Sequence, residues 1–248
     1  MILDDDITVT REPARQPPRA LSWAAATSIG LRRSTNEDRW GDRNDQRFVV
    51  TDGVAGTRGG ELASELAREA FLSVRAGNDW IRAIRGIDEW LTKRTLESGY
   101  ANAASTLAGI DITGPHVHII HVGDSRVYRL RRGEITGLTT DHNLANRRVR
   151  SGRPPDDHDG LGKPRALTSY LGMGETSLEV SVQTSDLEPG DRLLLCTDGV
   201  HEQMALTTLG DLLSRETVRE SADRLVQAAD DAGGRDNATA LVVEVAVP

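Results

Sequence analysis

Aspartate directly follows a short apolar segment at three places in the sequence, at Asp52, Asp124 and Asp198. Each segment has the length and the branched residues of a buried strand, so each carboxyl group is expected where a strand meets a loop. A single Asp-Gly step after a strand is a common turn. Two of the three, however, repeat the string Thr-Asp-Gly-Val, and a fourth acid, Asp236, stands just before the last predicted strand. The pattern indicates one shared site.

Oxygen-only clusters of this kind suit hard cations such as Mg²⁺ or Mn²⁺ and do not suit zinc. Carboxylates that are packed together repel one another and raise their own pKa values, and bound cations relieve that repulsion. A shared aspartate can bridge two ions that lie about 3.5 to 4 Å apart. Asp52 is followed by Gly53, which leaves the backbone free for its carbonyl group to bind an ion as well. Glu37 and Asp38 supply two more carboxylates nearer the start of the chain.

The elements that must position these acids can be read from apolar periodicity. Strands are predicted over residues 48–51, 117–122, 127–130, 192–196 and 240–247. A hairpin is predicted over 126–135, with its turn at Arg132-Gly133. Helical spacing is found over residues 59–75, 80–96, 206–213 and 219–230. Strands and helices come in groups without strict alternation, so the sequence predicts α+β layers and not a doubly wound sheet.

Composition excludes several classes of protein. The 248 residues carry 30 Lys and Arg against 38 Asp and Glu, a net charge of -8, which argues against general nucleic-acid binding. No apolar run approaches the roughly 20 residues needed to span a bilayer. The N-terminus is acidic where a signal peptide is basic, so a cytoplasmic location without a membrane is expected. The single cysteine, Cys196, excludes an internal disulfide framework, and nothing suggests a coiled coil, so a monomer is expected.

The domain organisation follows from the distribution of proline, glycine and charge. Residues 1–20 are polar and contain three prolines, which predicts a flexible arm. The stretch 150–165 is also rich in Gly, Pro and charge, and it resembles either a domain boundary or a long surface loop beside a site. The apolar segments on either side are too short to form two cores. We therefore predict one domain over residues 21–248.

Seven short motifs follow one another in order along the chain. They are Arg33-Ser34-Thr35-Asn36-Glu37-Asp38, Asp52-Gly53-Val54-Ala55-Gly56, Ser105-Thr106, Gly123-Asp124-Ser125-Arg126, Thr139-Thr140-Asp141-His142, Thr197-Asp198-Gly199 and Asp236-Asn237. Any single motif is weak, but the ordered set resembles the metal-dependent protein phosphatase family, known as PPM or protein phosphatase 2C. The resemblance extends over about residues 22 to 246.

The resemblance implies a four-layer α-β-β-α sandwich, in which helices flank a central antiparallel β-sandwich and a metal centre lies at one end. By position in the motifs, Asp52 would bridge two Mn²⁺ or Mg²⁺ ions and the Gly53 carbonyl would bind the second. Asp198 and Asp236 would complete the shell of the first ion.

The same resemblance gives roles to four further residues. Glu37 and Asp38 would hold the second ion, directly or through water. Asp124, together with Asp198, would match the site of a third ion in bacterial-type members. Arg33 would bind the substrate phosphate, and a guanidinium fork suits two phosphate oxygens at any working pH.

A member of this family would hydrolyse phosphoserine and phosphothreonine in proteins, with a metal-activated water attacking phosphorus. Its substrates would be phosphoproteins, with a Ser/Thr kinase among them. The alternative is a pseudophosphatase, a binding module that keeps the fold and recognises phosphoproteins without turning them over. Asp52, Asp124, Asp198, Asp236 and Arg33 are all in place, which favours the enzyme, because unused buried carboxylates cost stability.

The sequence departs from the family pattern in one loop. Animal-type members carry histidine, a candidate general acid, at the position of Val54, so water must protonate the leaving alkoxide here. Bacterial-type members often have glycine where this chain has Ala55, and the loop should still turn. The flap, which lies near the site in this family, maps to about 144–165, and its sequence is idiosyncratic.

Histidines offer a competing metal site. His116, His118 and His121 fall within one predicted strand, but the first two point to one face and the third to the other, so they cannot share a zinc ion. His142 follows Asp141 in the family's Thr-x-Asp-His string, and we interpret that pair as organising its loop.

Three other features could be mistaken for catalytic groups. Ser125 lacks a Gly-x-Ser-x-Gly elbow and is interpreted as structural. Cys196 lies among leucines in a predicted strand, which indicates a buried thiol without a catalytic role. The arginines at 126, 129, 131 and 132 are predicted to lie on a solvated hairpin, with docking of a phosphorylated partner as the alternative.

Overall fold

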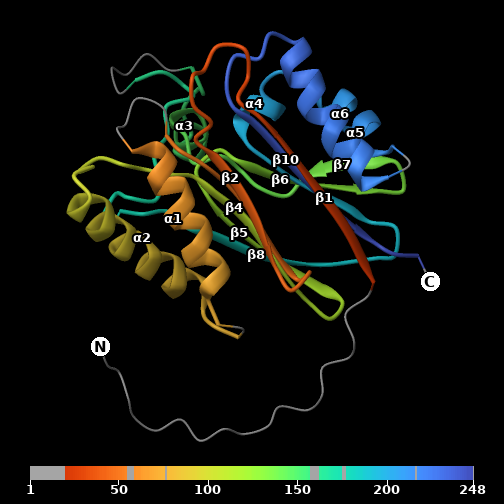
Figure 1. Cartoon of the computed structure of the whole chain (residues 1–248), viewed down its shortest axis with the longest axis horizontal. Helices are drawn as coiled ribbons and strands as arrows, with labels where there is room; N and C mark the ends of the chain where they lie inside the picture. Colours follow the sequence, from red (N-terminus) through yellow and green to blue (C-terminus); the bar gives the residue numbers. More distant parts are fainter. Residues whose placement is uncertain are drawn as a thin grey trace, which may run out of the picture.

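The computed structural model describes residues 20–54, 59–75, 77–156, 162–174, 177–215 and 217–247. Two five-stranded antiparallel sheets lie face to face, and helices cover both outer faces (Figure 1). This arrangement confirms the predicted α+β class and the four-layer α-β-β-α sandwich. The predicted arm, residues 1–20, falls outside the described residues except for Ala20.

The first sheet has the strand order β1-β10-β9-β6-β7. Its strands are β1 (Leu21–Ser28), β10 (Ala238–Val245), β9 (Arg192–Cys196), β6 (Arg126–Arg131) and β7 (Glu134–Gly137). The second sheet has the order β2-β3-β4-β5-β8. Its strands are β2 (Asp38–Arg43), β3 (Arg47–Asp52), β4 (Leu107–Thr113), β5 (His116–Val122) and β8 (Ser181–Asp186). The first and last strands of the chain therefore pair with each other.

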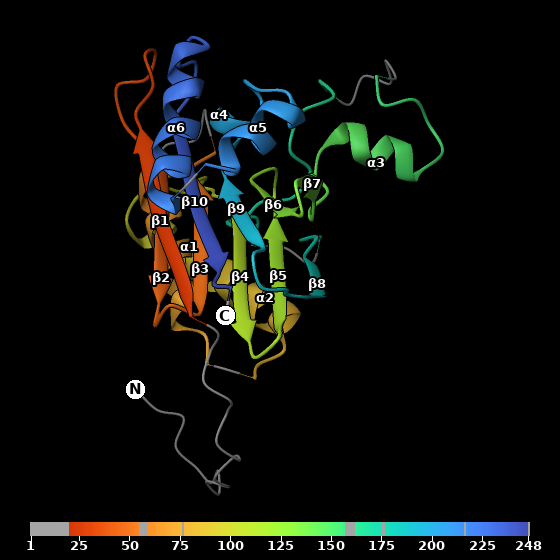
Figure 2. The same cartoon turned by 90° about the vertical axis from the view of Figure 1, so that its right-hand side faces the viewer.

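The longer helices are amphipathic and bury one stripe each, and the described residues form six helices in all. They are α1 (Gly60–Ser73), α2 (Trp80–Glu97), α3 (Leu144–Arg150), α4 (Asp198–His201), α5 (Leu206–Leu213) and α6 (Val218–Asp231). The Asp79 side chain caps α2 by accepting from the backbone N–H of Ile81, at 2.9 Å, and of Arg82. α1 and α2 cover the second sheet, and α5 and α6 cover the first (Figure 1). α3 stands beside the sandwich (Figure 2).

Three apolar layers hold the sandwich together. The central layer, between the sheets, includes Phe48, Ile110 and Leu193, all fully buried. Leu194 and Cys196, which point the other way from β9, pack under α5 and α6. Each large apolar side chain removed from water contributes about 1.5 to 3 kcal/mol. β9 is buried on both faces, which explains its apolar run from Leu193 to Cys196.

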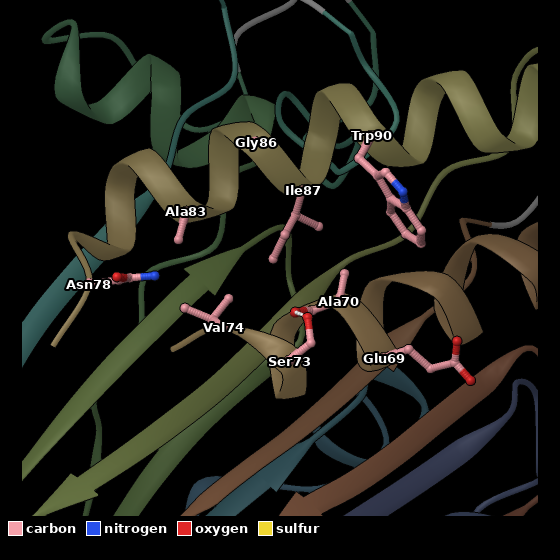
Figure 3. Close-up of a pocket in the computed structure, with 9 residues that line it drawn as sticks. All are labelled: Glu69, Ala70, Ser73, Val74, Asn78, Ala83, Gly86, Ile87 and Trp90. Atoms are coloured by element: carbon pink, nitrogen blue, oxygen red, sulfur yellow. Dashed lines mark hydrogen bonds between the residues drawn. The ribbon is translucent and has the colours of Figure 1, made fainter. Parts of the chain in front are cut away.

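A groove separates α1 and α2 on the outer surface (Figure 3). Small residues, among them Ala70, Ala83 and Gly86, line it and leave its space unfilled, and Trp90 stands at one end. Its volume is about 550 Å³.

The predicted helices and strands are confirmed to within a few residues, and β9 and α5 agree at both ends. β1, β2, β4 and β8 were not predicted. β1 is rich in alanine, and β8 is a polar edge strand, so neither shows a strong period. Within the region predicted as the flap, residues 144–150 form helix α3.

The predicted hairpin is confirmed, and Arg132 is solvated, but Arg126 and Arg131 are not free in solvent as expected. Arg131 donates to both carboxylate oxygens of buried Asp191, at 2.7 and 2.6 Å. Arg126 holds Asp141 in the same bidentate way, at 2.7 Å for each bond. Arg126 and Arg131 therefore neutralise buried acids, which the local sequence could not reveal because both partners are distant in the chain.

Candidate metal centre

The predicted acids meet at one end of the sandwich because several strands end or begin there. Asp38 opens β2 and Asp52 closes β3, and the two are direct partners in the antiparallel register. Asp124 follows β5, which runs parallel to β3 since both pair with β4. In the first sheet, Asp198 follows β9 and Asp236 precedes β10. The two sheets together contribute all five aspartates.

Burial and mutual repulsion raise the pKa values of four carboxyl groups, those of Asp38, Asp52, Asp124 and Asp198. Desolvation is the largest cause for Asp52, followed by the charges of Asp38 and Asp198, and its pKa lies well above the usual value. Asp198 shows the same behaviour, with desolvation followed by the charge of Asp124. Desolvation raises the pKa of Asp124 to about 7 and that of Asp38 to about 6. The cluster is therefore unfavourable as a set of bare anions.

Hydrogen bonds satisfy only part of this cluster. Asp38 Oδ2 accepts from Thr197 Oγ1 at 2.8 Å. Among the described residues, the buried atoms Asp38 Oδ1 and Asp198 Oδ1 have no hydrogen-bond partner. Buried carboxylate oxygens without a donor are costly, so each calls for a cation from outside the chain.

The carboxylate oxygens of the cluster are the ligand type that a hard divalent cation prefers, but their side chains are not positioned to coordinate one in this structure. In the described part of the chain, no three His, Cys, Asp or Glu side chains are grouped so that they could hold an ion as they stand. One reason is that Asp236 is turned toward Arg33, whose Nη2 lies 2.6 Å from its Oδ2. Within the centre, Asp38 and Asp198 each keep one buried oxygen atom still to satisfy.

Arg33 lies at the edge of the cluster, where its side chain is 34% exposed. Its loop is tied to the segment before β10, because the N–H of Leu31 donates to the Gly234 carbonyl at 2.8 Å. The guanidinium charge lowers the pKa of Glu37, whereas desolvation, the largest cause, raises it. Arg33 is therefore close to Asp236 and Glu37 and still open to solvent.

Glu37 lies at the N-terminus of α1, where the N–H of Glu61 donates to its carboxyl group. This contact serves as a cap for a helix whose N-cap residue, Gly59, has no side chain. The Glu37 carbonyl accepts from the N–H of Gly53 at 3.2 Å. A Cβ at Gly53 would lie 2.5 Å from the Gly60 backbone, so only glycine fits between the two segments.

Asn237 organises the centre without having been assigned a role from the sequence. Its Oδ1 accepts from the N–H of Glu37 at 2.9 Å, and its Nδ2 donates to the carbonyls of Ile29 and Thr35 at 2.9 Å each. The Asn237 carbonyl would lie 1.9 Å from a Cβ at Gly199. Asn237 thus fixes the Arg33 loop against β10, and its place directly after Asp236 was the one available signal.

Asp124 is connected to the predicted flap through its neighbours His201 and Glu202. His201 Nε2 lies 2.9 Å from the Asp124 carbonyl, so the neutral imidazole donates there. The charge of Glu202 adds to the raised pKa of Asp124, after desolvation and Asp141. Glu202 also pairs with Arg165, at the end of the flap region. His201 and Glu202 were not singled out in the sequence.

The serine, the cysteine and the histidines that were not assigned to the metal centre have structural roles. Ser125 is buried and shares a hydrogen bond with Thr106 Oγ1 at 2.7 Å. Cys196 is fully buried, and burial raises the pKa of its thiol. His116 and His118 bond to β8 on one face of the sheet, whereas His121 points to the other and packs on His142, with ring centroids 4.6 Å apart. The alternation predicted for this strand is confirmed.

Comparison with known proteins identifies the family. A sequence model described as "Protein phosphatase 2C" matches residues 31–242. The chain belongs to this family, and the resemblance found in its motifs is confirmed.

Individual relatives agree with this assignment. The serine/threonine protein phosphatase PstP of Mycobacterium tuberculosis is 31% identical over 247 residues, which cover 91% of this chain but 45% of the relative. The chain thus spans less than half the length of that relative. The serine/threonine phosphatase Stp of Listeria welshimeri is 32% identical, with 88% of this chain and 93% of the relative covered.

Solved structures show the same fold. A crystal structure of the M. tuberculosis PstP phosphatase superposes with a TM-score of 0.81 and 29% identity over 92% of this chain and 99% of that one. A second structure, of the PstP catalytic domain in complex with two manganese ions, gives a TM-score of 0.78 at the same identity and coverage. Within the described ranges, no helix is both long enough and apolar enough to cross a membrane.

Proposed function

We propose that this protein is a metal-dependent phosphatase that removes phosphate from phosphoserine and phosphothreonine side chains of proteins, with Mn²⁺ or Mg²⁺ as cofactor. The observation that carries the proposal is the buried cluster of carboxylates with raised pKa values, two of whose oxygens lack a donor, beside a solvent-accessible arginine. Membership of the protein phosphatase 2C family and the manganese-bound PstP structure support it.

The assignment of ligands follows the positions of the family's motifs. Asp52 would bridge two ions, with the Gly53 carbonyl on the second and Asp198 with Asp236 on the first. Glu37 and Asp38 would complete the second ion, directly or through water. Asp124 and Asp198 would hold a third. When bound, the ions supply neutralising charge and an activated water as the nucleophile toward phosphorus.

The chain's own residues then orient the substrate and the ligands. Arg33 binds two phosphate oxygens through its guanidinium fork, after exchanging its bond to Asp236 for the substrate. Thr197 holds one oxygen of Asp38 and leaves the other for coordination. The aliphatic side chain of Val54 cannot donate a proton, so the leaving alkoxide takes its proton from water.

Several finer expectations belong to the same proposal. The substrates are phosphoproteins, including a Ser/Thr kinase, and the protein acts as a cytoplasmic monomer without nucleic acid or membrane. The segment 144–165 acts as a flap beside the site, a role that the Arg165–Glu202 ion pair supports. Residues 21–248 form one phosphatase domain after the N-terminal arm.

Hydrolysis of p-nitrophenyl phosphate tests the proposal. We expect turnover with Mn²⁺ or Mg²⁺, none with EDTA, and a loss of roughly 100-fold or more in Asp198→Asn, which removes a ligand charge and almost no volume. The matched control is Asp211→Asn, an exposed acid on α5, which should retain activity. No turnover with either ion, in protein shown to be folded, would overturn the enzyme and leave the phosphoprotein-binding pseudophosphatase.

A further inference from the structure

A second pocket opens directly beside the candidate metal centre, and of its lining residues only Glu37 has a part in the chemistry described above. Its volume is about 390 Å³. It is lined by Thr35, Glu37, Arg39, Gly59, Glu61, Leu62, Glu65 and Tyr100. Glu37 belongs to both the pocket and the metal centre, and Thr35 is two residues beyond Arg33. A phosphorylated side chain bound at Arg33 therefore places its neighbours in the substrate chain at this pocket.

Tyr100 forms one wall because of how α2 ends. Gly99 adopts φ +84°, and the N–H of Tyr100 turns back to the Thr95 carbonyl at 2.8 Å. The ring then lies against Gly59, where a Cβ would be 2.7 Å from the ring atom Cγ. Tyr100 remains 40% exposed. An aromatic face is thus fixed in position and open to a ligand.

Among the described residues that line the pocket, the one cation is Arg39, and it is already engaged. Its Nε donates to Glu65 at 3.0 Å and its Nη2 to Glu61 at 2.7 Å. Its Nη1 donates to the backbone carbonyls of Asn36 and Asp38 at 2.8 Å each. With four bonds made, Arg39 has little capacity left for an anionic ligand.

The acceptors of the pocket, in contrast, have capacity left. The Glu61 side chain is 60% exposed, and its bond to Arg39 uses one of two oxygens. A carboxylate accepts about four hydrogen bonds. An ammonium or guanidinium group could bond to Glu61 while it lies over the Tyr100 ring, a face that attracts cations.

We propose that this pocket binds a lysine or arginine side chain close in sequence to the phosphorylated residue of the substrate protein. The pocket would make the enzyme selective for phosphosites in basic surroundings. This inference rests on the proposed function, because it assumes that the phosphate lies at Arg33.

Phosphoserine peptides that differ in one residue test the inference. Arginine, alanine or glutamate is placed in turn at each position from three before to three after the phosphoserine. We expect kcat/KM to be about five- to tenfold higher for arginine than for alanine at one or more positions. Each value is divided by the value for p-nitrophenyl phosphate with the same variant, which corrects for changes at the metal centre.

Variants of the pocket then identify its residues. Glu61→Gln and Tyr100→Ala should each bring the arginine-to-alanine ratio toward one, and Glu61→Lys should favour glutamate. Glu69→Gln is the matched control, since Glu69 lies on the same helix but lines the outer groove of Figure 3, and it should keep the native ratio. Circular dichroism checks that each variant is folded.

Binding separates this inference from the proposed function. Peptides with a non-hydrolysable phosphonate in place of phosphoserine are titrated by fluorescence anisotropy, and the same arginine preference, lost in Glu61→Gln, is expected. If the native chain binds with that preference but turns over no substrate, the proposed function fails and the pocket stands. If arginine gives no preference at any position, or the preference survives both Glu61→Gln and Tyr100→Ala, the pocket inference is wrong.

Discussion

Strand β9 has a buried aspartate, Asp191, just before it and a half-buried one, Asp198, just after it, and the two differ in their hydrogen-bond partners. Asp191, 1% exposed, receives two bonds from Arg131 and a third from the N–H of Glu188 at 2.8 Å. Asp198, at the other end, keeps a buried oxygen for which the described residues supply no donor. Its neighbours are other carboxylates, which raise its pKa.

The difference teaches how to tell structural acids from functional ones. Asp141 has a bidentate arginine, and Asp88 accepts from three consecutive backbone N–H groups, those of Gly172, Met173 and Gly174. The chain thus supplies partners to both carboxylate oxygens of Asp88, Asp141 and Asp191, which support its fold. Asp38 and Asp198 each keep one buried oxygen without a donor, as does Asp230 outside the centre, so a missing donor indicates a cation site only where several carboxylates meet.

The largest expected effects come from replacing the aspartate at either end of β9. Asp191→Ala should lower the free energy of unfolding by about 3 to 5 kcal/mol, because it leaves Arg131 without its buried partner. Asp198→Asn should lower activity without destabilising the metal-free protein, because it removes a repelled charge. Urea unfolding in EDTA measures both. A stability loss in Asp198→Asn as large as that in Asp191→Ala would break the distinction.

Divalent ions should stabilise the folded protein, and this stabilisation should depend on Asp198. At an Mn²⁺ concentration of 100 times its Kd, the native protein should gain nearly 3 kcal/mol, about 5 to 10 °C in Tm. Asp198→Asn should lose most of this shift, and Asp211→Asn should keep it. Differential scanning calorimetry with and without EDTA provides the measurement, and an equal shift in both variants would contradict the ligand assignment.

Two buried histidines also differ in their hydrogen-bond partners. His142 has partners for both ring nitrogens, whereas neither nitrogen of the fully buried His121 has a hydrogen-bond partner among the described residues. Desolvation, the largest cause, lowers the pKa of His121 to about 3. At pH 5 the unfolded chain protonates this residue and the folded one does not. Stability is therefore lost as pH falls below the unfolded value of 6.5.

Between pH 7.5 and pH 5, His121 alone should reduce the free energy of unfolding by about 2 kcal/mol. Urea titrations at the two pH values, with the native chain and His121→Asn, give the comparison. The variant is less well packed at both pH values, but its change with pH should be smaller by that amount. An identical pH dependence in the two proteins would mean that another group dominates.

The smallest effect concerns the partly exposed ion pair between Arg33 and Asp236. Unlike Arg131, Arg33 is expected to exchange its carboxylate for a phosphate. Arg33→Ala should therefore raise KM for p-nitrophenyl phosphate about tenfold, with little change in stability. Steady-state kinetics with saturating Mn²⁺ measures it. A fall in kcat alone would mean that Arg33 acts in the transition state instead.

The sequence was most informative where residues are buried on both sides or repeat a motif. β9 was predicted to the residue because all five of its side chains are buried. β1 and β8 were missed because their identity depends on pairing with β10 and β5, which no local period reveals. The ordered motifs predicted that five aspartates would meet. The support given by Asn237 and Thr197 could not be predicted, because it consists of hydrogen bonds between distant segments.

The pairing of β1 with β10 has a consequence for synthesis of the chain. β10 lies between β1 and β9, so the centre of the first sheet stays open until residues near 245 have been made. The hairpins of the second sheet can form early, since β2 to β5 are consecutive. Asp236 and Asn237 arrive with the last strand, so a growing chain holds an incomplete centre. We expect activity to appear in one late step, when the two ends of the domain meet.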